Sequence, residues 1–138
     1  MVDLSGGCNC GATRYRITSA AKRVSHCHCT ICRRAGGAVA GTFATFDAAA
    51  VTWQGAEPRL YRSSDFAFRR FCGACGSQLA FGYDALPELV SITVGTLDSP
   101  ELTPAERHDF AAERIPWVQL DAQLPATPRW WDPPPGKE

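Results

Sequence analysis

Seven cysteines in a chain of 138 residues restrict its fold more than any other feature, because they fall into three short clusters. In chain order the clusters are Cys8 and Cys10; Cys27, Cys29 and Cys32; and Cys72 and Cys75. Cysteines spaced this closely are typical of a metal site, a redox centre or a disulfide framework. The choice among these decides how the polypeptide is held together.

The start of the chain and the cysteine count argue against disulfides. Residues 1–8 contain neither the charged nor the apolar segment of a secretory signal peptide. No apolar run approaches the ~20 residues that a membrane-spanning helix needs. We therefore expect a cytoplasmic protein with no membrane partner, whose thiols stay reduced and serve metal binding or catalysis. An odd number of cysteines also fits paired bridges poorly.

Length and charge set the remaining bounds. Acidic and basic residues balance at 14 each, which argues against a nucleic-acid partner held mainly by charge. A chain of 138 residues is the size of one domain. We expect that domain over residues 1–125, followed by a proline-rich C-terminal tail over 126–138 in which Trp130 and Trp131 pack against the body. The oligomeric state is left open.

Short alternating segments separated by Gly, Pro, Asp and Ser predict an all-β fold. The expected strands lie within 12–19, 23–29, 38–46, 51–55, 59–64, 66–72, 77–83 and 89–97. Aromatic residues at strand-like spacing are expected to pack in the core. They are Phe43, Phe46, Phe68, Phe71 and Phe81.

Helix is expected only as single turns. Residues 30–37 form one candidate, which Gly36 and Gly37 would end. Residues 100–108 form the other, with Pro104 suited to the first helical position.

The third cluster indicates a structural metal site. Its second cysteine is followed by Gly76, as in a zinc knuckle, where glycine lets backbone amides turn toward the sulfurs. The alternative, a thioredoxin-type redox pair, requires a βαβ unit that the pattern lacks. A closed zinc site needs four ligands and a knuckle supplies two, so the first cluster is the natural source of the others. The expected ligands are Cys8, Cys10, Cys72 and Cys75.

This division leaves Cys27, Cys29 and Cys32 as a site with three thiolates. Three protein ligands and an open fourth position are the ligand count of a catalytic zinc. The alternative is that a histidine closes this site as well and makes it purely structural. The candidate histidines are His26, His28 and His108.

A zinc ion held by three thiolates is a weak activator of water. Its natural work is to bind a substrate thiol, lower the pKa of that thiol and present it as a nucleophile. Addition to, or release from, a carbonyl carbon is one resulting reaction. Arginine pairs lie next to two clusters, where they would donate hydrogen bonds to sulfur or form a solvated face. These pairs are Arg33-Arg34 and Arg69-Arg70.

Several motifs recur together in one known family. In order they are SGGCNCGATRY, CHCTICRRAGG, GTFATF, RRFCGACGSQL, VGTLDSP, His108 and Pro116-Trp117. From about Gly6 to Trp117 the sequence closely resembles the glutathione-dependent formaldehyde-activating enzyme (GFA) family, which includes the centromere protein V type.

The resemblance implies a fold, two zinc ions and an activity. The fold is Mss4-like, with coiled antiparallel sheets around a structural zinc, so residues 1–125 would be a single GFA-type zinc domain. The four-cysteine zinc is tightly held, and the second zinc, on the other three cysteines, is labile and partly occupied. The reaction of the namesake enzyme joins glutathione and formaldehyde into S-(hydroxymethyl)glutathione, formally a carbon–sulfur lyase run toward addition. The implied partners are thus a small thiol and an aldehyde.

Site roles follow from the resemblance and from local pattern. Cys27, Cys29 and Cys32 would form the catalytic site together with His28, which strand alternation points away from the ligands and which would shuttle protons or serve a structural hydrogen bond. The expected substrate-binding residues are Arg33 and Arg34, which would pair with carboxylates of the thiol, and Trp117, which would line the open zinc or pack in the core.

Two other functions compete with the enzyme. The namesake is a longer chain, and its middle cluster lacks His28 and the Arg33-Arg34 pair, so the protein could be a non-catalytic, zinc-stabilised binding module. A zinc store or redox sensor, in which oxidation ejects the labile metal, is the third reading.

Overall fold

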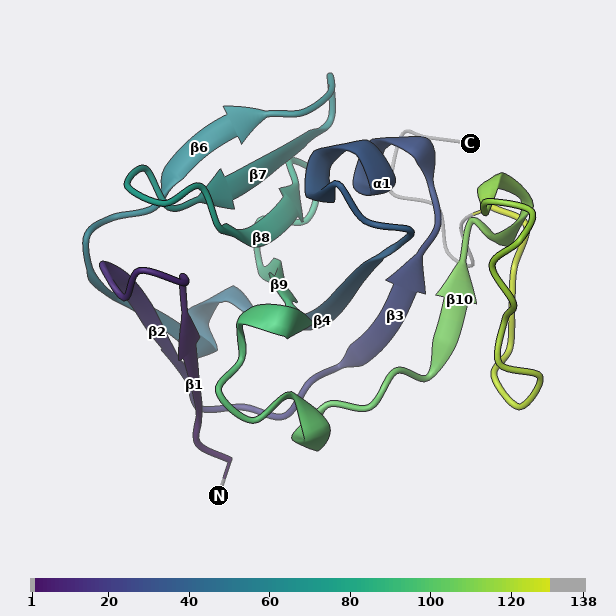
Figure 1. The fold of residues 1–138 in the computed structure, drawn as a ribbon. Coiled ribbons are helices and arrows are strands. Elements are labelled where there is room, and N and C mark those ends of the chain that lie inside the picture. The colour runs from purple at the N-terminus through teal and green to yellow at the C-terminus, as the bar shows by residue number, and fades with distance from the viewer. Residues whose placement is uncertain (1, 130–138) are drawn as a thin grey trace.

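The computed structural model describes residues 2–129, in which the strands form two sheets (Figure 1). A three-stranded antiparallel sheet has the order β1-β2-β5, and a seven-stranded sheet has the order β10-β3-β4-β9-β8-β7-β6. The smaller sheet contains β1 (Leu4–Gly7), β2 (Thr13–Ile17) and β5 (Val51–Gly55). The larger contains β3 (Arg23–Cys27), β4 (Gly41–Asp47), β6 (Arg59–Arg62), β7 (Ala67–Phe71), β8 (Gln78–Tyr83), β9 (Leu89–Thr93) and β10 (Arg107–Asp109).

The expected all-β fold is confirmed, and each expected strand is present. Two strands were missed. β1 (LSGG) contains two glycines and no β-branched or aromatic residue, so its propensity for strand is low. β10 is three residues long and is held by its pairing with β3, which is parallel, whereas the other named strand pairs are antiparallel. Both strands depend on long-range partners.

The α-helix α1 (Thr30–Gly36) ends as expected. Gly37 adopts the left-handed conformation with φ of 62°, and its N–H donates to the carbonyl of Arg33. The second expected turn is a 3₁₀ helix, η3 (Pro100–Leu102), which begins at Pro100 rather than at Pro104. Other 3₁₀ turns are η1 (Ala48–Ala50), η2 (Val94–Thr96) and η4 (Ala111–Glu113).

The core lies between the two sheets. β2 contributes Tyr15 and Ile17, whose side chains are fully buried, and the large sheet presents Ala44 and Phe46 of β4 to the same cluster. Because side chains alternate along a strand, Phe43 and Thr45 point to the opposite face of the large sheet. One face of this sheet is thus committed to the core, and the other is available for a site.

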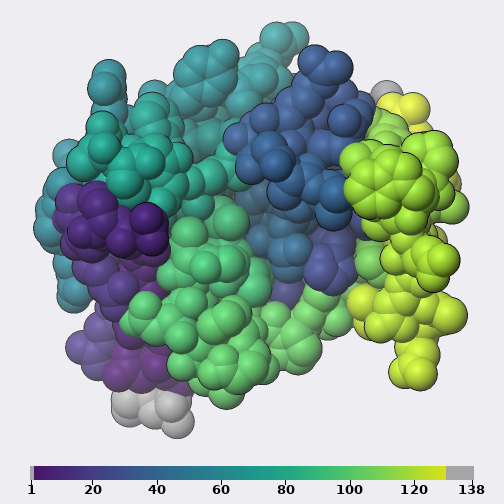
Figure 2. All heavy atoms as spheres, in the orientation of Figure 1, coloured from purple at the N-terminus to yellow at the C-terminus, as the bar shows by residue number. Residues whose placement is uncertain are grey.

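The C-terminal part of the described chain lies along β10, at the side of the molecule (Figure 2). Ala126 forms a parallel bridge with His108, and the N–H of Ala111 donates to the carbonyl of Thr127 over 2.7 Å. The first residues of the expected tail therefore pair with β10, while Trp130 and Trp131 lie outside the described residues. None of the helices within 2–129 has the length and apolar character needed to cross a membrane.

Replacing Phe46 by alanine tests the assignment of the core. The Phe46 side chain is fully buried, so Phe46→Ala should lower the free energy of unfolding by about 3–5 kcal/mol. Leu60, on β6, is 53% exposed, and Leu60→Ala should change the free energy of unfolding by no more than about 0.5 kcal/mol. Denaturant titration of the zinc-loaded protein measures both. Similar losses for the two variants would contradict this packing.

Candidate functional site

The structure gathers the three sequence clusters into two separate groups of sulfurs, called the first and second clusters from here on. The first cluster consists of Cys8, Cys10, Cys72 and Cys75, whose sulfurs all lie within 4.8 Å of one another. The Cys8 and Cys10 sulfurs are 3.6 Å apart, and those of Cys10 and Cys72 are 3.8 Å apart. Four sulfurs bound at about 2.3 Å to a tetrahedral zinc ion would be about 3.8 Å from one another. The donor set and its dimensions therefore fit a closed zinc site.

Local backbone structure shapes this four-cysteine cluster. Cys8 and Cys10 follow β1, while Cys72 and Cys75 lie in the turn between β7 and β8; the two segments lie side by side in Figure 2. The Thr13 N–H donates to the Cys8 sulfur over 3.3 Å. At the knuckle, the Ala74 N–H donates to Cys72 over 3.4 Å. The bond from Thr13 lowers the pKa of Cys8 and so favours its thiolate form.

The second cluster lies where β3 passes into α1. Cys27 is the last residue of β3, Cys29 is the residue that caps the start of α1, and Cys32 is buried in the first turn of the helix. The Cys29 sulfur accepts the Cys32 N–H over 3.2 Å, so it also caps the helix. The three sulfurs lie within 4.8 Å of one another. Within residues 2–129, no histidine or carboxylate joins this group.

Charge is divided unevenly within the three-cysteine cluster. Hydrogen bonds from the Cys27 and Cys29 thiols lower the pKa of Cys32 to about 3, and the Arg69 guanidinium contributes in the same direction. Hydrogen bonding with Cys29 and Cys32, together with burial, raises the pKa of Cys27. These opposite shifts place negative charge on Cys32 in preference to Cys27, and metal binding would displace the protons that the cluster still holds.

Arg69 of β7 reaches this cluster from across the large sheet. Its Nη2 donates to the Cys32 sulfur over 3.3 Å, and the guanidinium carbon lies 5.4 Å from the centre of the Phe81 ring. The side chain is 5% exposed. The sequence predicted that an arginine donates a hydrogen bond to a cysteine sulfur. Arg69 does so, but its acceptor is Cys32 rather than Cys72, which it precedes in the chain.

The histidines form a group beside the second cluster. His28 is buried, and its Nε2 lies 3.0 Å from Nδ1 of His108 on β10, so one nitrogen donates a hydrogen bond and the other accepts it. The His26 and His108 rings stack with centres 5.0 Å apart. Burial lowers the pKa of His28 and of His108, which favours neutral imidazoles. His28 is therefore packed against a neighbouring strand and does not line the pocket described below.

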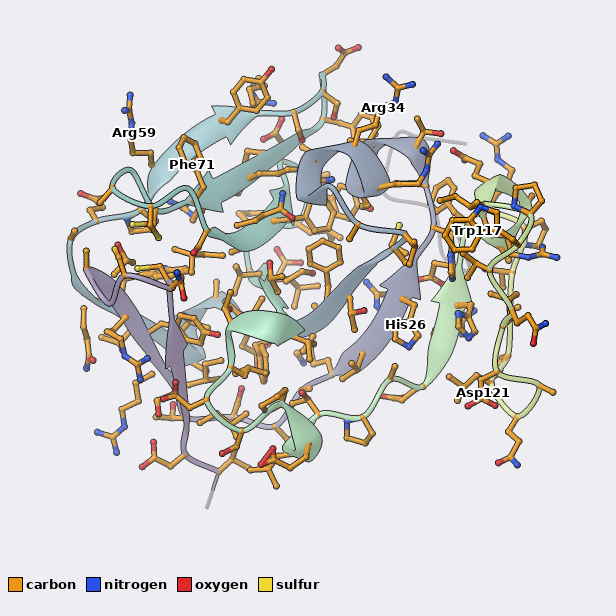
Figure 3. All side chains as sticks on the ribbon, viewed as in Figure 1. His26, Arg34, Arg59, Phe71, Trp117 and Asp121 are labelled. Atoms are coloured by element: carbon orange, nitrogen blue, oxygen red, sulfur yellow. The ribbon has the colours of Figure 1, made fainter. Side chains whose placement is uncertain are left out.

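The three expected substrate-binding residues lie elsewhere. Arg34 is exposed and extends from α1 (Figure 3). It borders a second hollow together with Phe71 of β7. Arg33, the preceding residue, is half-buried on α1. Trp117 follows η4 and is 72% exposed, so it is not a core residue. The pocket that opens onto the second cluster is not lined by Arg33, Arg34 or Trp117.

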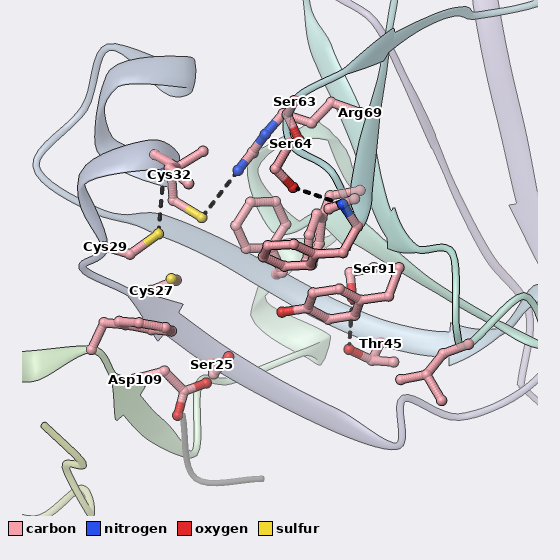
Figure 4. Close-up of a pocket in the computed structure, with 18 of the residues that line it drawn as sticks. Ser25, Cys27, Cys29, Cys32, Thr45, Ser63, Ser64, Arg69, Ser91 and Asp109 are labelled. Atoms are coloured by element: carbon pink, nitrogen blue, oxygen red, sulfur yellow. Dashed lines mark hydrogen bonds between the residues drawn. The ribbon is translucent and has the colours of Figure 1, made fainter. Parts of the chain in front are cut away.

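That pocket occupies the free face of the large sheet (Figure 4). It has a volume of about 440 Å³, and the three cysteines line one end of it. Aromatic residues line much of the remainder: Phe43, Phe66, Phe81, Tyr83 and Phe110. Phe46 belongs to the core as expected, but Phe43 and Phe81 also form the wall of a cavity, which composition could not reveal.

Acidic groups beside the cysteines were also missed. Asp109, paired in register with Cys27, lines the pocket and accepts a hydrogen bond from Nε of Arg107 over 3.0 Å. Glu113 lines the pocket as well, and it accepts the Thr30 N–H over 3.0 Å. Asp109 is the last residue of β10, and Glu113 lies four residues after it. The sequence offered one signal for this part of the site, His108, which directly precedes Asp109.

Comparison with known proteins identifies the family of the chain. The family model described as "Glutathione-dependent formaldehyde-activating enzyme" matches residues 3–113, which is most of the chain. The chain belongs to this family. The matched region contains both cysteine clusters and the strands around the pocket.

Two relatives extend the comparison. A Halomonas elongata protein named "Putative glutathione-dependent formaldehyde-activating enzyme" is 33% identical over 129 residues, which cover 87% of this chain and 82% of the relative. A crystal structure of a Rhodobacter sphaeroides protein superposes with a TM-score of 0.59 at 23% identity, covering 73% of this chain and 96% of that one. The second comparison supports the fold alone.

Removing one ligand from each cluster should separate their roles. Cys8 and Cys72 belong to the core, so Cys72→Ala should lose the structural zinc and lower the unfolding temperature strongly. Cys27→Ala should stay folded and bind about one zinc ion per chain. Zinc quantification and thermal unfolding measure both effects. Equal destabilisation by the two variants would contradict the division into a structural and an open site.

Arg69 should strengthen metal binding at the second cluster. Arg69→Met removes the donor to Cys32 and should weaken zinc binding at that cluster about 10–100-fold. Arg70→Met is the matched control, because Arg70 lies over the Phe68 ring instead. Competition with a chelator measures the affinity of the second cluster for zinc. Equal affinities in the two variants would show that the Arg69–Cys32 bond has no such effect.

Proposed function

We propose that this protein is a zinc-dependent carbon–sulfur lyase, which adds a small thiol such as glutathione to an aldehyde such as formaldehyde, or reverses that addition, in the cytoplasm. One observation carries the proposal. The sulfurs of Cys27, Cys29 and Cys32 converge without a fourth ligand from residues 2–129, and they do so at the end of a pocket of about 440 Å³. An open coordination position beside a cavity is the arrangement of a catalytic metal site rather than a structural one.

Family membership supports the same reaction. The relative from Halomonas elongata carries a name that refers to glutathione and formaldehyde. At the second cluster, Cys27, Cys29 and Cys32 would hold the zinc ion, and at the first Cys8, Cys10, Cys72 and Cys75 would hold a structural one. When bound, the catalytic zinc would supply a positive charge that stabilises a substrate thiolate at neutral pH.

The residues of the chain have separate roles in this proposal. Arg69 holds a positive charge against Cys32 and so limits the negative charge that the three thiolates accumulate. The carboxylate of Asp109, next to Cys27 in register, is placed to accept the proton of the incoming thiol and to return it to the carbinol oxygen of the product. The His28–His108 pair fixes the junction between β3 and β10, on which this carboxylate depends.

Apolar rings form part of the pocket wall. Phe43 and Phe81 meet with ring centres 5.5 Å apart. An apolar wall lowers the local dielectric constant and so strengthens the attraction between charged groups. The binding-module alternative required a protein ligand to close the second cluster, and the described residues provide none.

The direct test adds glutathione and formaldehyde to the protein loaded with two zinc ions and follows hemithioacetal formation by exchange spectroscopy. The expected result is a rate well above that of the uncatalysed reaction. Cys27→Ala should abolish the increase, and Asp109→Asn should reduce it by about 10²–10⁴-fold if the carboxylate transfers the proton. A rate equal to the uncatalysed one, with both zinc ions present, would contradict the proposed function.

A further inference from the structure

The free face of the large sheet is built for more than a one-carbon substrate. Successive strands contribute alternate residues to it, and the paired registers align them side by side. They are Ser25 on β3, Phe43 and Thr45 on β4, Ser91 on β9 and Phe81 on β8. Thr45 and Ser91 are hydrogen-bonded to each other over 2.9 Å, so neither hydroxyl needs a ligand as a partner.

The size of the cavity is the first argument. A water molecule takes up about 30 Å³ in the liquid. Formaldehyde has one more heavy atom, so it would fill only a small fraction of a pocket of about 440 Å³. A cavity of that volume is within the range of pockets that hold molecules of drug-like size.

The lining is the second argument. Phe81 lies edge-on to Tyr83 with ring centres 4.8 Å apart, and Tyr83 stacks with Phe66 at 6.0 Å. With Phe43, these residues form a row of aromatic rings that leads away from the cysteines. Leu86 and Leu89 continue the apolar wall. Such a surface gains little from a small polar aldehyde and much from an apolar ring.

The charged groups of the pocket are the third argument. Arg69 is engaged with Cys32. Asp109 is engaged with Arg107, and Glu113 with the backbone and hydroxyl of Thr30. These three charges lie at the end of the pocket near the cysteines, where the sulfur chemistry is proposed, whereas Arg23, the fourth charged residue of the lining, is at the opposite end of β3 from Cys27. The row of rings beyond them is therefore left for the carbon substituent of a substrate.

We infer that the carbonyl substrate carries an apolar substituent about the size of a phenyl ring, which the row of aromatic residues binds while its carbonyl carbon meets the thiol at the cysteines. The inference rests on the proposed function. In the addition, a carbon–sulfur bond forms, the π bond of the carbonyl group breaks, and the thiol proton ends on the carbinol oxygen. No oxidant or reductant is needed.

The test compares formaldehyde with phenylacetaldehyde, using glutathione as the thiol and the two-zinc protein as catalyst. For each aldehyde, the measured quantity is the rate enhancement over the uncatalysed reaction of that aldehyde. Phenylacetaldehyde should show an enhancement at least about tenfold greater. Turnover of formaldehyde with an equal or greater enhancement would overturn the inference and leave the proposed function intact. Turnover of neither aldehyde would refute the proposed function instead.

A binding measurement decides the preference independently of turnover. S-benzylglutathione and S-methylglutathione differ by one ring and contain no free thiol. Calorimetry should give a dissociation constant at least about tenfold lower for the benzyl compound. Equal constants would overturn the inference, whatever the kinetic outcome.

Matched variants locate the effect in the pocket. Phe66→Ala removes one ring of the row and should reduce the preference for the benzyl compound several-fold, and Phe66→Leu, which keeps bulk and supports folding, should reduce it less. Phe71→Ala is the control, because Phe71 lies near the same hairpin and borders the other hollow. An unchanged preference in Phe66→Ala, or an equal loss in Phe71→Ala, would contradict the assignment of the ring to this pocket.

Discussion

The approach of Cys8 and Cys10 to the β7–β8 turn is the contact on which the rest of the structure depends. It joins the start of the chain to a segment more than sixty residues away, with the Cys10 and Cys72 sulfurs 3.8 Å apart. Cys8 and Cys72 are also members of the core, so the same residues link the sheets and fill space between them. A metal bound at that point would tie the two segments together and add to the stability that the core supplies.

The open cluster depends on a different constraint, the passage from strand to helix at Cys27–Cys32. A thiol at the end of β3, one at the N-cap of α1 and one in its first turn are brought together by a segment of six residues. The long-range contribution comes from β10 and β7, which place Asp109 and Arg69 beside these sulfurs. Local structure therefore positions the ligands, and the sheet supplies the groups that modify them.

Spacing alone was enough to predict the strands other than β1 and β10, the all-β fold and the two groups of cysteines that the structure brings together, because these depend on local pattern and on ligand counts. The pocket could not be predicted, since Phe43 and Phe46 are three positions apart in β4, on opposite faces of the sheet, and the sequence does not show which face is covered by the core. The partner of Arg69 was missed for a similar reason. Sequence shows that an arginine precedes Cys72, but only the sheet shows that its side chain reaches Cys32.

The short distance along β7 between Arg69 and Cys72 links the two centres physically. A register shift between Arg70 and Phe71 separates Arg69, which donates to Cys32 of the open cluster, from Cys72, which belongs to the closed cluster. Metal in the closed cluster would hold the end of β7 in place and with it the guanidinium, and would so favour metal binding at the open cluster. Because such coupling is reciprocal, metal in the open cluster would strengthen binding at the closed cluster by the same factor, and the two centres would load cooperatively.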